Sequence, residues 1–390
     1  MNQFFVFGSP STVLYGVGCL DAVGERVMQF AATRALIVTD DSAVRTGKVE
    51  RLMSILAASG LGASVYSAVN TEPTTLHVDE SLALLRADGC NLVIGFGGGS
   101  PIDTAKAVAV LATNPGTFFD YHGQFVDIPN PRLPLVAITT TAGTGSEVTK
   151  ASVITDTQRD VKMVMRGDRV RPDLAVCDPL MTLSMPPVVT AATGMDALAH
   201  AIEGSVSSET QPMSEVFALE AIKRISRSLP IACANGNDIE ARSDMMLGQL
   251  LAGYAFGISS TASGHGMARP LGGRFHIPHG LCNALCLPIF MEYTLPACPH
   301  MFAKMAVAMG EDISGLVVWD AARKAIDAVK RIKRLINIPT IREIGVDVEE
   351  FRRLIPIMAQ DGIDAGSHQV NPRVPTHKEL CAMYELLLAE

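Results

Sequence analysis

Two segments in the second half of the chain carry side chains of the types that bind metal ions. In TGMDALAHAIEG, Asp196 and His200 are four residues apart, which puts both on one face of a helix. In GHGMARPLGGRFHIPHG, His265 and His279 flank a Gly-Gly pair and can reach a common point if the chain turns back there. A lone histidine is usually a packed or surface side chain, but no purely structural role calls for all four groups. One carboxylate and three imidazoles predict a divalent-metal site suited to iron or zinc.

Two turns rich in glycine and hydroxyl groups lie in the first half of the chain. Gly97-Gly98-Gly99-Ser100 follows the strand-like LVIGF and opens the helical PIDTAKAVAV, and residues 139–146, TTTAGTGS, follow another strand-like run. Glycines and a helix N-terminus suit a pyrophosphate group. Either turn alone is also explained as a tight turn, and neither is GxGxxG. Together, at the carboxyl ends of parallel strands, they predict a nucleotide site.

Asp40 ends the first clear strand and bears on the choice of nucleotide. A carboxylate there can accept hydrogen bonds from both ribose hydroxyls and repel a 2′-phosphate, so NAD is favoured over NADP. A plain turn aspartate beside Asp41 explains the same residue nearly as well, and Arg45 nearby keeps NADP open.

The elements that must position these residues change in type along the chain. Strand-like runs at 34–41, 63–69 and 92–96 alternate with helical periods at 48–60, 75–89 and 101–112. This alternation predicts a parallel sheet with helices on both faces. After Pro186-Pro187 nearly every segment has a helical period. We therefore expect an α/β dinucleotide-binding domain over residues 1–186 and an all-α metal-binding domain over residues 187–390.

Composition narrows the class of protein. The 390 residues favour two or more domains, and 48% hydrophobic with 18% charged residues is ordinary for a globular chain. A net charge of −8 argues against a nucleic-acid partner. The first residues lack a basic start before an apolar core, and no apolar run of about 18 residues suggests a membrane span. Eight cysteines without CxxC spacing fit a reduced cytoplasm.

Four motifs, in order along the chain, resemble those of the iron-containing (group III) alcohol dehydrogenases. They are FGGGSPIDTAKA, TTTAGTGSEVT, GMDALAHAIE and the block from His265 to His279, and VNPR (370–373) resembles a short C-terminal element of the family. The resemblance runs from about residue 12 to residue 373. It implies iron(II), with zinc in some relatives, a cytoplasmic location, and a homodimer or larger homo-oligomer.

The resemblance also assigns roles to individual residues. It implies that Asp196, His200, His265 and His279 hold the metal. Lys162, which is otherwise explained as a surface lysine on an edge strand, is implied to lie near the nicotinamide ribose. The nucleotide contacts that the resemblance implies are Asp40, Gly98, Gly99, Ser100, Asp103, Thr140, Thr141, Thr144, Lys162 and Leu180. The metal would act as a Lewis acid on the substrate oxygen while hydride passes between the substrate carbon and NAD.

One position departs from the family pattern. Many members carry a second histidine four residues after the third ligand, often assigned to proton relay, and here that place holds Arg269. Arginine does not titrate near neutral pH, but its paired donors suit a carboxylate, phosphonate or sulfonate. We hypothesise a small aldehyde or alcohol with an anionic group, in a pocket completed by Arg274 and His276. His276 would then also transfer protons. A pairing of Arg269 with an internal carboxylate, and ordinary aliphatic alcohols as substrates, are the alternatives.

Two other enzyme classes share the expected architecture. One is a zinc-dependent, glycerol dehydrogenase-like activity, which the residues of the four motifs fit less well. A 3-dehydroquinate synthase-like reaction uses NAD only transiently, so steady release of NADH would exclude it. A nucleotide sensor without catalysis is disfavoured because all four metal-ligand residues are present.

Overall fold

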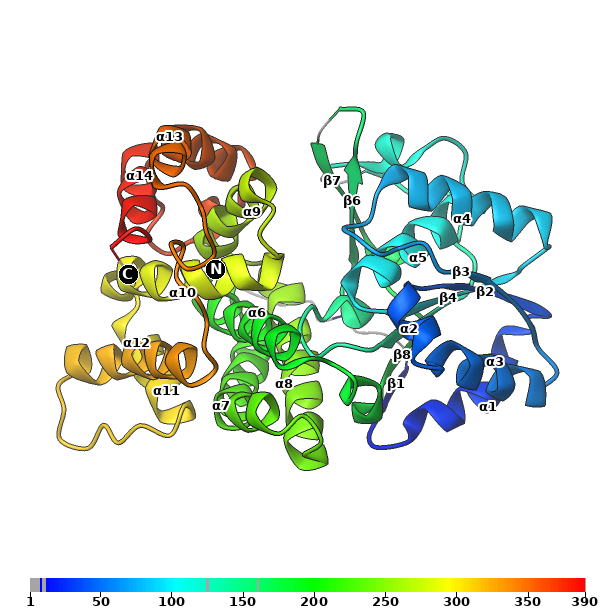
Figure 1. The fold of residues 1–390 in the computed structure, drawn as a ribbon, viewed down its shortest axis with the longest axis horizontal. Coiled ribbons are helices and arrows are strands. Elements are labelled where there is room, and N and C mark those ends of the chain that lie inside the picture. The colour runs from blue at the N-terminus through cyan, green and yellow to red at the C-terminus, as the bar shows by residue number, and fades with distance from the viewer. Residues whose placement is uncertain (1–7, 9–11, 124–125, 160, 390) are drawn as a thin grey trace, which may run out of the picture. The chain divides into compact units, whose positions relative to one another are not determined.

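The computed structural model describes residue 8 and residues 12–123, 126–159 and 161–389. The chain divides into two compact units, Gly8–Ser184 and the residues from Met185 onward. Figure 1 shows strands with helices in the first and helices in the second. The expectation that the chain has no secretory signal rests on its first residues. Residues 1–7 and 9–11 lie outside the described ranges.

The first unit, the sheet unit, is built on six parallel strands in the order β1-β8-β5-β4-β2-β3. Strands 34–41 and 63–69 of the sequence analysis correspond to β2 and β3. The predicted parallel sheet is confirmed. Its strands are β1 (Thr12–Tyr15), β2 (Arg34–Val38), β3 (Gly62–Tyr66), β4 (Leu92–Gly97), β5 (Leu135–Thr139) and β8 (Leu174–Cys177).

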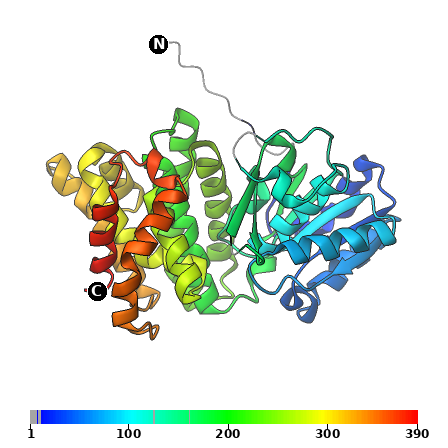
Figure 2. The ribbon, with the colours of Figure 1, turned by 90° about the horizontal axis from the view of Figure 1, so that it is seen from above.

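Helices cover both faces of this sheet because its central strands are largely apolar and buried on both faces. Along β2, Leu36 and Val38 pack in one core with α4 and α5, while Ala35 and Ile37 pack in another with α1 and α3. This is the alternation that a pleated strand imposes. The helices are α1 (Val23–Val27), α2 (Asp41–Arg45), α3 (Lys48–Ala58), α4 (Thr75–Ala87) and α5 (Gly99–Leu111). Figure 2 shows the sheet unit from above.

A hairpin of β6 (Ala151–Asp156) and β7 (Val161–Arg166) leaves the main sheet after β5. The sequence analysis suggested an edge strand only around Lys162, which lies in β7, and did not identify the hairpin. The hairpin is antiparallel, and Thr155 bridges to Thr74 just before α4. Short 3₁₀ turns complete the unit: η1 (Cys19–Ala22), η2 (Met28–Phe30), η3 (Phe118–Tyr121), η4 (Ser146–Val148), η5 (Asp168–Val170) and η6 (Pro179–Thr182).

The second unit, the helical unit, contains helices and no strand over residues 185–389, as expected. Glycines let its central helices approach closely: a Cβ on Gly194 would lie 2.3 Å from Leu229 Cδ1, and one on Gly204 would lie 3.1 Å from the Phe256 nitrogen. The helices are α6 (Pro187–Val206), α7 (Pro212–Ala234), α8 (Ile239–Ser259), α9 (Ser263–Phe275), α10 (His279–Thr294), η7 (Leu295–Ala297), α11 (Pro299–Ala308), α12 (Val318–Leu335), α13 (Val348–Asp364), η8 (Ser367–Val370) and α14 (His377–Leu386).

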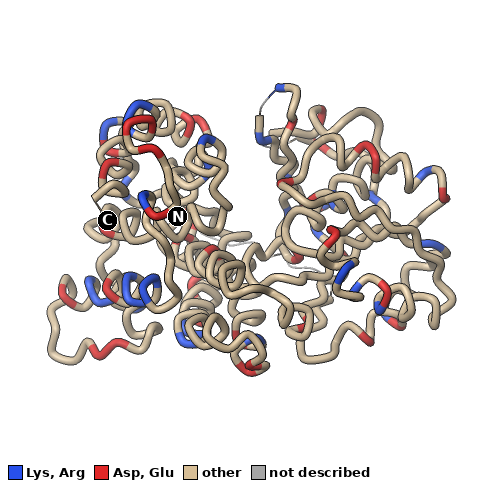
Figure 3. Tube along the Cα trace, in the orientation of Figure 1, with Lys and Arg blue, Asp and Glu red and all other residues tan. Residues whose placement is uncertain are grey.

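Acidic and basic residues are interspersed along the chain (Figure 3). Basic residues are densest along α12, where Lys330 and Arg331 form ion pairs with Glu292 and Glu311. None of the described helices combines the length and the apolar character that a bilayer crossing requires.

Candidate metal centre and nucleotide-binding turns

Three helices of the helical unit bring three metal-ligand side chains together. Asp196 from α6, His265 from α9 and His279 from α10 offer ligand atoms that all lie within 4.8 Å of one another. The Asp196 Oδ1 atom is 3.6 Å from His265 Nε2 and 3.8 Å from His279 Nε2. Asp196 and His265 are buried, while His279 is partly exposed. The three side chains are therefore shielded from solvent except at His279, as in a metal site that keeps one coordination position open.

Two glycines beside the ligands allow the helices to meet. A Cβ on Gly280, next to His279, would lie 2.4 Å from the Ala192 carbonyl oxygen on α6. A Cβ on Gly264, next to His265, would lie 2.6 Å from Glu203 Oε1 on the same helix. A larger residue at 280 would push α10 away from α6, and one at 264 would displace the Glu203 carboxylate. The two histidines therefore reach Asp196 because their neighbours have no side chain.

The expected turn at Gly272-Gly273 is wrong. Both glycines lie inside α9, and the chain reverses three residues later, where His276 has a φ of 54° and Pro278 precedes α10. Gly272 is packed, since a Cβ there would lie 3.1 Å from the Ile277 carbonyl oxygen. The left-handed residue that ends a helix is usually glycine, so the histidine at this place hid the true turn.

His200, the fourth expected ligand, lies beside the cluster of three. Its Nε2 atom is 4.0 Å from Asp196 Oδ1, as the four-residue spacing predicts. Its ring stacks between two others, with centroids 4.5 Å from His265 and 4.1 Å from Phe256. The structure thus places all four groups in one region of the helical unit and brings three of them to a common point.

Glu203, which the sequence analysis did not identify, binds His265 at the ring nitrogen that faces away from Asp196. Its Oε1 atom is 2.6 Å from His265 Nδ1, and its Oε2 accepts from the backbone N–H groups of Ala262 and His265 at 2.6 and 3.2 Å. The bond at Nδ1 leaves Nε2 directed toward Asp196. The signal was present in the sequence, because Glu203 follows Asp196 by seven residues and so shares its helix face.

The charges of this cluster stabilise one another. Burial opposes ionisation of Asp196, but three histidines outweigh it and hold the pKa of Asp196 well below its usual range. Burial likewise disfavours the His265 cation, yet Glu203 and Asp196 raise the pKa of His265 to about 9. The two buried carboxylates, Asp196 and Glu203, supply negative charge that suits a divalent cation in place of the histidine protons.

Asn283 shows that the three ligand atoms point to one place. Its Nδ2 atom lies 2.6 Å from Asp196 Oδ1, 3.1 Å from His265 Nε2 and 3.2 Å from His279 Nε2. A single amide nitrogen within reach of all three shows that the three ligand atoms converge on one place. The donor set of carboxylate and imidazoles and its convergence both fit an iron(II) or zinc ion.

In the sheet unit, the two glycine-rich turns lie side by side. The last residues of β4 and β5, Gly97 and Thr139, are register partners, so both turns start at the same edge. The Thr140 N–H donates to the Gly97 carbonyl at 2.9 Å. A Cβ on Gly99 would lie 3.1 Å from Thr144 Cγ2, and one on Gly98 would lie 3.4 Å from Thr141 Cγ2. Helix α5 begins here, with Ser100 in its first turn and Gly98 as its N-cap, and its free N–H groups suit a phosphate.

Asp40 lies against the first of these turns. Its Oδ1 accepts from the Ala43 N–H at 2.9 Å and caps α2, while its Oδ2 lies 2.9 Å from where a Gly97 Cβ would be. Asp40 therefore both caps α2, as a turn aspartate would, and lies beside the glycine-rich turn, as a nucleotide-binding carboxylate would. Arg45 is 3.9 Å from the carboxylate of Asp41.

Three other expected nucleotide contacts have protein partners. Both carboxylate oxygens of Asp103 accept bonds inside the unit, from Ser146 Oγ at 2.5 Å and from the Val153 N–H at 2.9 Å. Lys162, on β7, pairs with Glu72 at 2.7 Å. The Leu180 N–H donates to Asp178 at 3.0 Å.

The side chains expected around the substrate lie on α9 or at its end. Arg269 is half-buried one turn after His265. Arg274 pairs with Asp361 at 2.8 Å, and His276 is exposed where α9 ends. The structure thus gives Arg274 a partner of its own.

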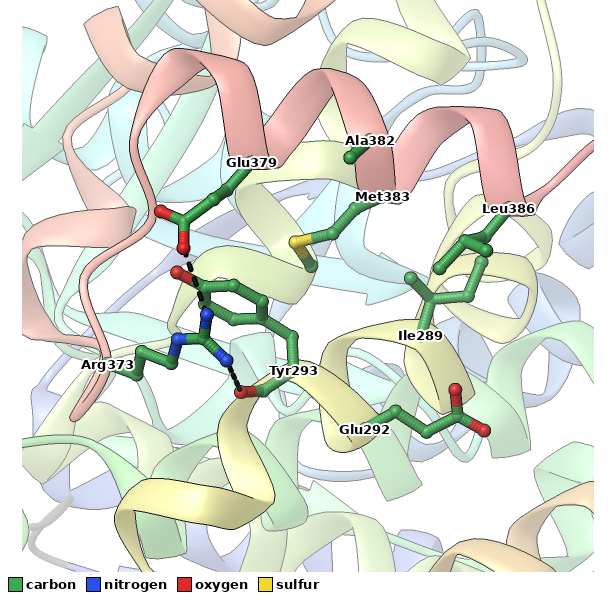
Figure 4. A pocket seen from close by; sticks show the side chains of 8 residues that line it. All are labelled: Ile289, Glu292, Tyr293, Arg373, Glu379, Ala382, Met383 and Leu386. Carbon is green, nitrogen blue, oxygen red and sulfur yellow. Dashed lines mark hydrogen bonds and ion pairs between the residues drawn. The ribbon is translucent and has the colours of Figure 1, made fainter.

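The VNPR element braces α9 and α10. Asn371 accepts from Ser263 Oγ at 3.0 Å and donates to Thr294 Oγ1 at 3.2 Å. Arg373 stacks over the Tyr293 ring at 4.0 Å and pairs with Glu379 at 2.9 Å. These side chains border a surface hollow of about 350 Å³ (Figure 4), lined by Ile289, Glu292, Tyr293, Arg373, Glu379, Ala382, Met383 and Leu386. Ile289 is about 15 Å along α10 from His279, so the hollow is separate from the metal ligands.

Comparison with known proteins gives a consistent result over both units. Residues 10–179 match the model of the iron-containing alcohol dehydrogenases, and residues 190–388 match that of the C-terminal part of the same family. The chain is 37% identical to the 1,3-propanediol dehydrogenase of Klebsiella pneumoniae over 98% of each chain. It is 38% identical to the NAD-dependent methanol dehydrogenase of Bacillus methanolicus over 97% of this chain and 98% of that protein.

Solved structures agree. A 1,3-propanediol oxidoreductase superposes with a TM-score of 0.95 at 37% identity, covering 99% of this chain and 100% of that one. A sulfoacetaldehyde reductase from Bifidobacterium kashiwanohense, solved with NAD⁺, gives a TM-score of 0.89 at 30% identity and covers 99% of each chain.

Proposed function

This chain belongs to the family of iron-containing alcohol dehydrogenases, and from that premise we propose which of its residues hold the metal, the nucleotide and the substrate. The activity class is that of the family: hydride transfer between NAD and a small alcohol or aldehyde. The cofactors expected from the sequence, NAD and iron, are confirmed at the level of the family. The glycerol dehydrogenase-like and 3-dehydroquinate synthase-like alternatives are accordingly disfavoured.

The metal ligands in this proposal are Asp196, His265 and His279, with His200 as the fourth. The observation that carries it is the convergence of three ligand atoms on the Asn283 amide, at 2.6 to 3.2 Å. Bound there, iron would supply a Lewis acid for the substrate oxygen. Glu203 keeps His265 turned so that Nε2 is available, and Asp196 contributes the negative charge. His279, being partly exposed, marks the side from which substrate enters.

The nucleotide in this proposal is held by the two turns of the sheet unit. Backbone N–H groups of Gly98, Gly99 and Ser100 would bind the pyrophosphate, and Thr140, Thr141 and Thr144 would add hydroxyl donors. The Asp40 carboxylate beside Gly97 would accept from the ribose and select NAD. Lys162 would bind the nicotinamide ribose after giving up its ion pair with Glu72. That ion pair is at the surface and therefore weak.

The substrate in this proposal is a small aldehyde or alcohol with an anionic group, held by Arg269. This residue is half-buried on α9, one turn from His265, and its charge does not vary with pH in the physiological range. A structural relative is named for sulfoacetaldehyde, an aldehyde with a sulfonate. A guanidinium suits such a group through two parallel hydrogen bonds. His276 is the candidate proton-transfer residue.

The test is NADH consumption by anaerobically purified, iron-loaded enzyme with matched aldehydes. Propanal and lactaldehyde are neutral, and succinic semialdehyde, sulfoacetaldehyde and phosphonoacetaldehyde are acidic. We expect a preference for one acidic aldehyde. The R269M variant should then lose about 10–100-fold in kcat/KM with that aldehyde and much less with propanal.

Because Arg274 pairs with Asp361, we leave it out of the proposed pocket, and R274M on the same helix is the matched control. It should lower both activities equally and only slightly. Equal losses with acidic and neutral aldehydes in R269M contradict the substrate assignment. They would return Arg269 to a structural role and leave the enzyme a dehydrogenase of aliphatic alcohols.

We also propose that the enzyme works in the cytoplasm as a homodimer or larger homo-oligomer. The eight cysteines, all of which lie in the described ranges, form no disulfide with one another, which agrees with a reducing compartment. Light scattering with size-exclusion chromatography measures the oligomer, and a monomeric mass at micromolar concentration would contradict the proposal.

A further inference from the structure

A lysine is completely buried in the second turn of α5, the helix that starts at the GGGS turn. Lys106 has no exposed surface, and its Nζ donates to the Ala151 carbonyl at 2.7 Å, to Ser146 Oγ at 2.9 Å and to Thr149 Oγ1 at 3.1 Å. Its fourth neighbour is Asp103 Oδ1 at 3.5 Å. All these acceptors belong to α5 itself or to the segment that follows the second turn.

Asp103 makes the complementary set of contacts. Its Oδ1 accepts from Ser146 Oγ and its Oδ2 from the Val153 N–H, at 2.5 and 2.9 Å. Its backbone carbonyl accepts from Ser152 Oγ at 2.8 Å. One side chain thus binds the end of the second turn and the start of β6. Asp103 and Lys106, which form an ion pair within α5, tie this helix to residues 146–153 through the six hydrogen bonds just given.

The tied segments carry the two turns. Gly98 and Gly99 begin α5, and Thr141 and Thr144 lie in the turn that leads to Ser146. Across the contact there is little free space, because a Cβ on Gly99 would lie 3.1 Å from Thr144. The separation of the turns therefore depends on where α5 and residues 146–153 are held relative to each other.

A largely buried ion pair, here between two residues of α5, is costly because both charges are mostly removed from water. Burial lowers the pKa of Lys106, and Asp103 and Glu147 oppose that effect. Apolar residues of similar volume often give equal or greater stability than a buried pair, so stability alone does not account for it. What a fully hydrogen-bonded pair adds is a fixed geometry.

We propose that Lys106 and Asp103 are positioning residues for NAD, which set the distance between the two turns that bind the pyrophosphate. Asp103 then acts through the protein and not as a direct nucleotide contact, since both its oxygens are used internally. The inference rests on the proposed binding of NAD by these turns. Neither residue touches the reacting atoms, so the chemical step itself is not their task.

The test compares K106M with the unchanged enzyme. We expect the Kd for NADH, followed by nicotinamide fluorescence, and the KM for NAD to rise about tenfold or more, because a small displacement of a binding group has a large effect. The loss in kcat at saturating NAD should be smaller than the rise in KM. The content of bound metal, measured on the same preparation, should not change.

R132M is the matched control in the same unit. Arg132 forms a partly buried ion pair with Asp173 at 2.6 Å and precedes β5, at the opposite end of the strand from the turns. It should lower the melting temperature and leave the Kd for NADH unchanged. A Kd that rises equally in R132M and K106M would overturn the proposal, because general loosening of the unit would then explain both.

Two further variants keep the test decisive if K106M does not fold. T149V removes one acceptor of Lys106 without changing volume, and it should raise the Kd for NADH in the same direction by a smaller factor. D103N should match K106M, and the D103N/K106M double variant should lose no more than either alone. Additive losses would instead make Asp103 a direct contact and overturn the positioning role. Failure of the unchanged enzyme to bind NADH would contradict the proposed function itself.

Discussion

The helical unit and the sheet unit direct their charged side chains in opposite ways. In the helical unit, Asp196 and the histidines point to a common place where Asn283 lies, and Glu203 supports them. In the sheet unit, Asp103 and Lys106 direct their charges into the protein. The glycine turns beside them offer mainly backbone N–H groups. The helical unit therefore presents side chains to its candidate site. The sheet unit presents mainly backbone N–H groups, on turns that are held by the buried Asp103 and Lys106.

This difference teaches what each unit tolerates. A site made of side chains depends on the identity of each ligand and on the partner that orients it. A site made of backbone depends on the distance between segments and on the absence of side chains at a few glycines. Substitutions in one unit should therefore change metal binding alone, and those in the other should change NAD binding alone.

The largest expected effect that would sharpen this comparison is that of E203Q. Glutamate offers two acceptor oxygens, to His265 Nδ1 and to two backbone N–H groups, whereas glutamine offers one and must turn an NH₂ toward a donor. Metal affinity should fall about 10–100-fold. Cobalt(II) absorption spectra and competition with a chelator measure it, and the Kd for NADH should stay the same.

Glu240→Gln serves as its control, since that carboxylate is exposed in the first turn of α8. It should change neither affinity. An E203Q variant that keeps full metal affinity, or that loses affinity for NADH as well, would break the division between the two units.

A smaller effect is expected from G280A. The added methyl group would lie 2.4 Å from the Ala192 carbonyl oxygen, so α10 must move away from α6. Thermal or urea unfolding should show a loss of about 1–3 kcal/mol in the free energy of unfolding. Metal affinity should fall with it, because His279 is the neighbouring residue.

G273A is the matched variant, because a Cβ at Gly273 meets no atom within 4 Å and the residue lies within α9. Alanine there should leave stability unchanged or raise it by up to about 1 kcal/mol. If G280A were as stable as G273A, the close approach of α6 and α10 would not be needed.

The smallest effect concerns acid stability away from both sites. Backbone and side-chain hydrogen bonds from Thr376 lower the pKa of Glu379 from its usual 4.5 to about 2. A lowered pKa stabilises the fold above pH 4.5, and this contribution is lost as the pH falls from 4.5 toward 2. E379Q should flatten the pH dependence of unfolding in that window, measured by circular dichroism. Because the group is at the surface, the change should be small.

Much of the fold could be predicted because its signals are local. The expected helix at 48–60 is α3 at Lys48–Ala58, and that at 75–89 is α4 at Thr75–Ala87. Apolar runs and glycine stops fix such elements without distant partners. The hairpin β6–β7 was not predicted because two of the three residues that β6 buries are polar, Ser152 and Asp156, so its apolar residues do not alternate in the sequence.

The site was predictable where residue type alone carries the information. Carboxylate and imidazole groups can be recognised as candidate metal ligands from residue type, and the four expected groups lie in one region of the helical unit. Asn283 and Lys106 could not be identified from the sequence. An asparagine or a lysine in a helix is usually exposed, and only the packed structure shows that these two are buried. Glu203 is the intermediate case, since its spacing from Asp196 was visible but its partner His265 comes from another helix.

The glycines at 264 and 280 link iron supply to the folding equilibrium of the helical unit. The ligands come from positions 196, 265 and 279, so they meet only when α6, α9 and α10 have packed. An unfolded chain has no such arrangement to offer an ion, and binding therefore draws the equilibrium toward the packed state. At free iron one hundred times its Kd, mass action adds about 2.7 kcal/mol to the free energy of unfolding. Cells short of iron would then hold less folded enzyme, as well as less active enzyme.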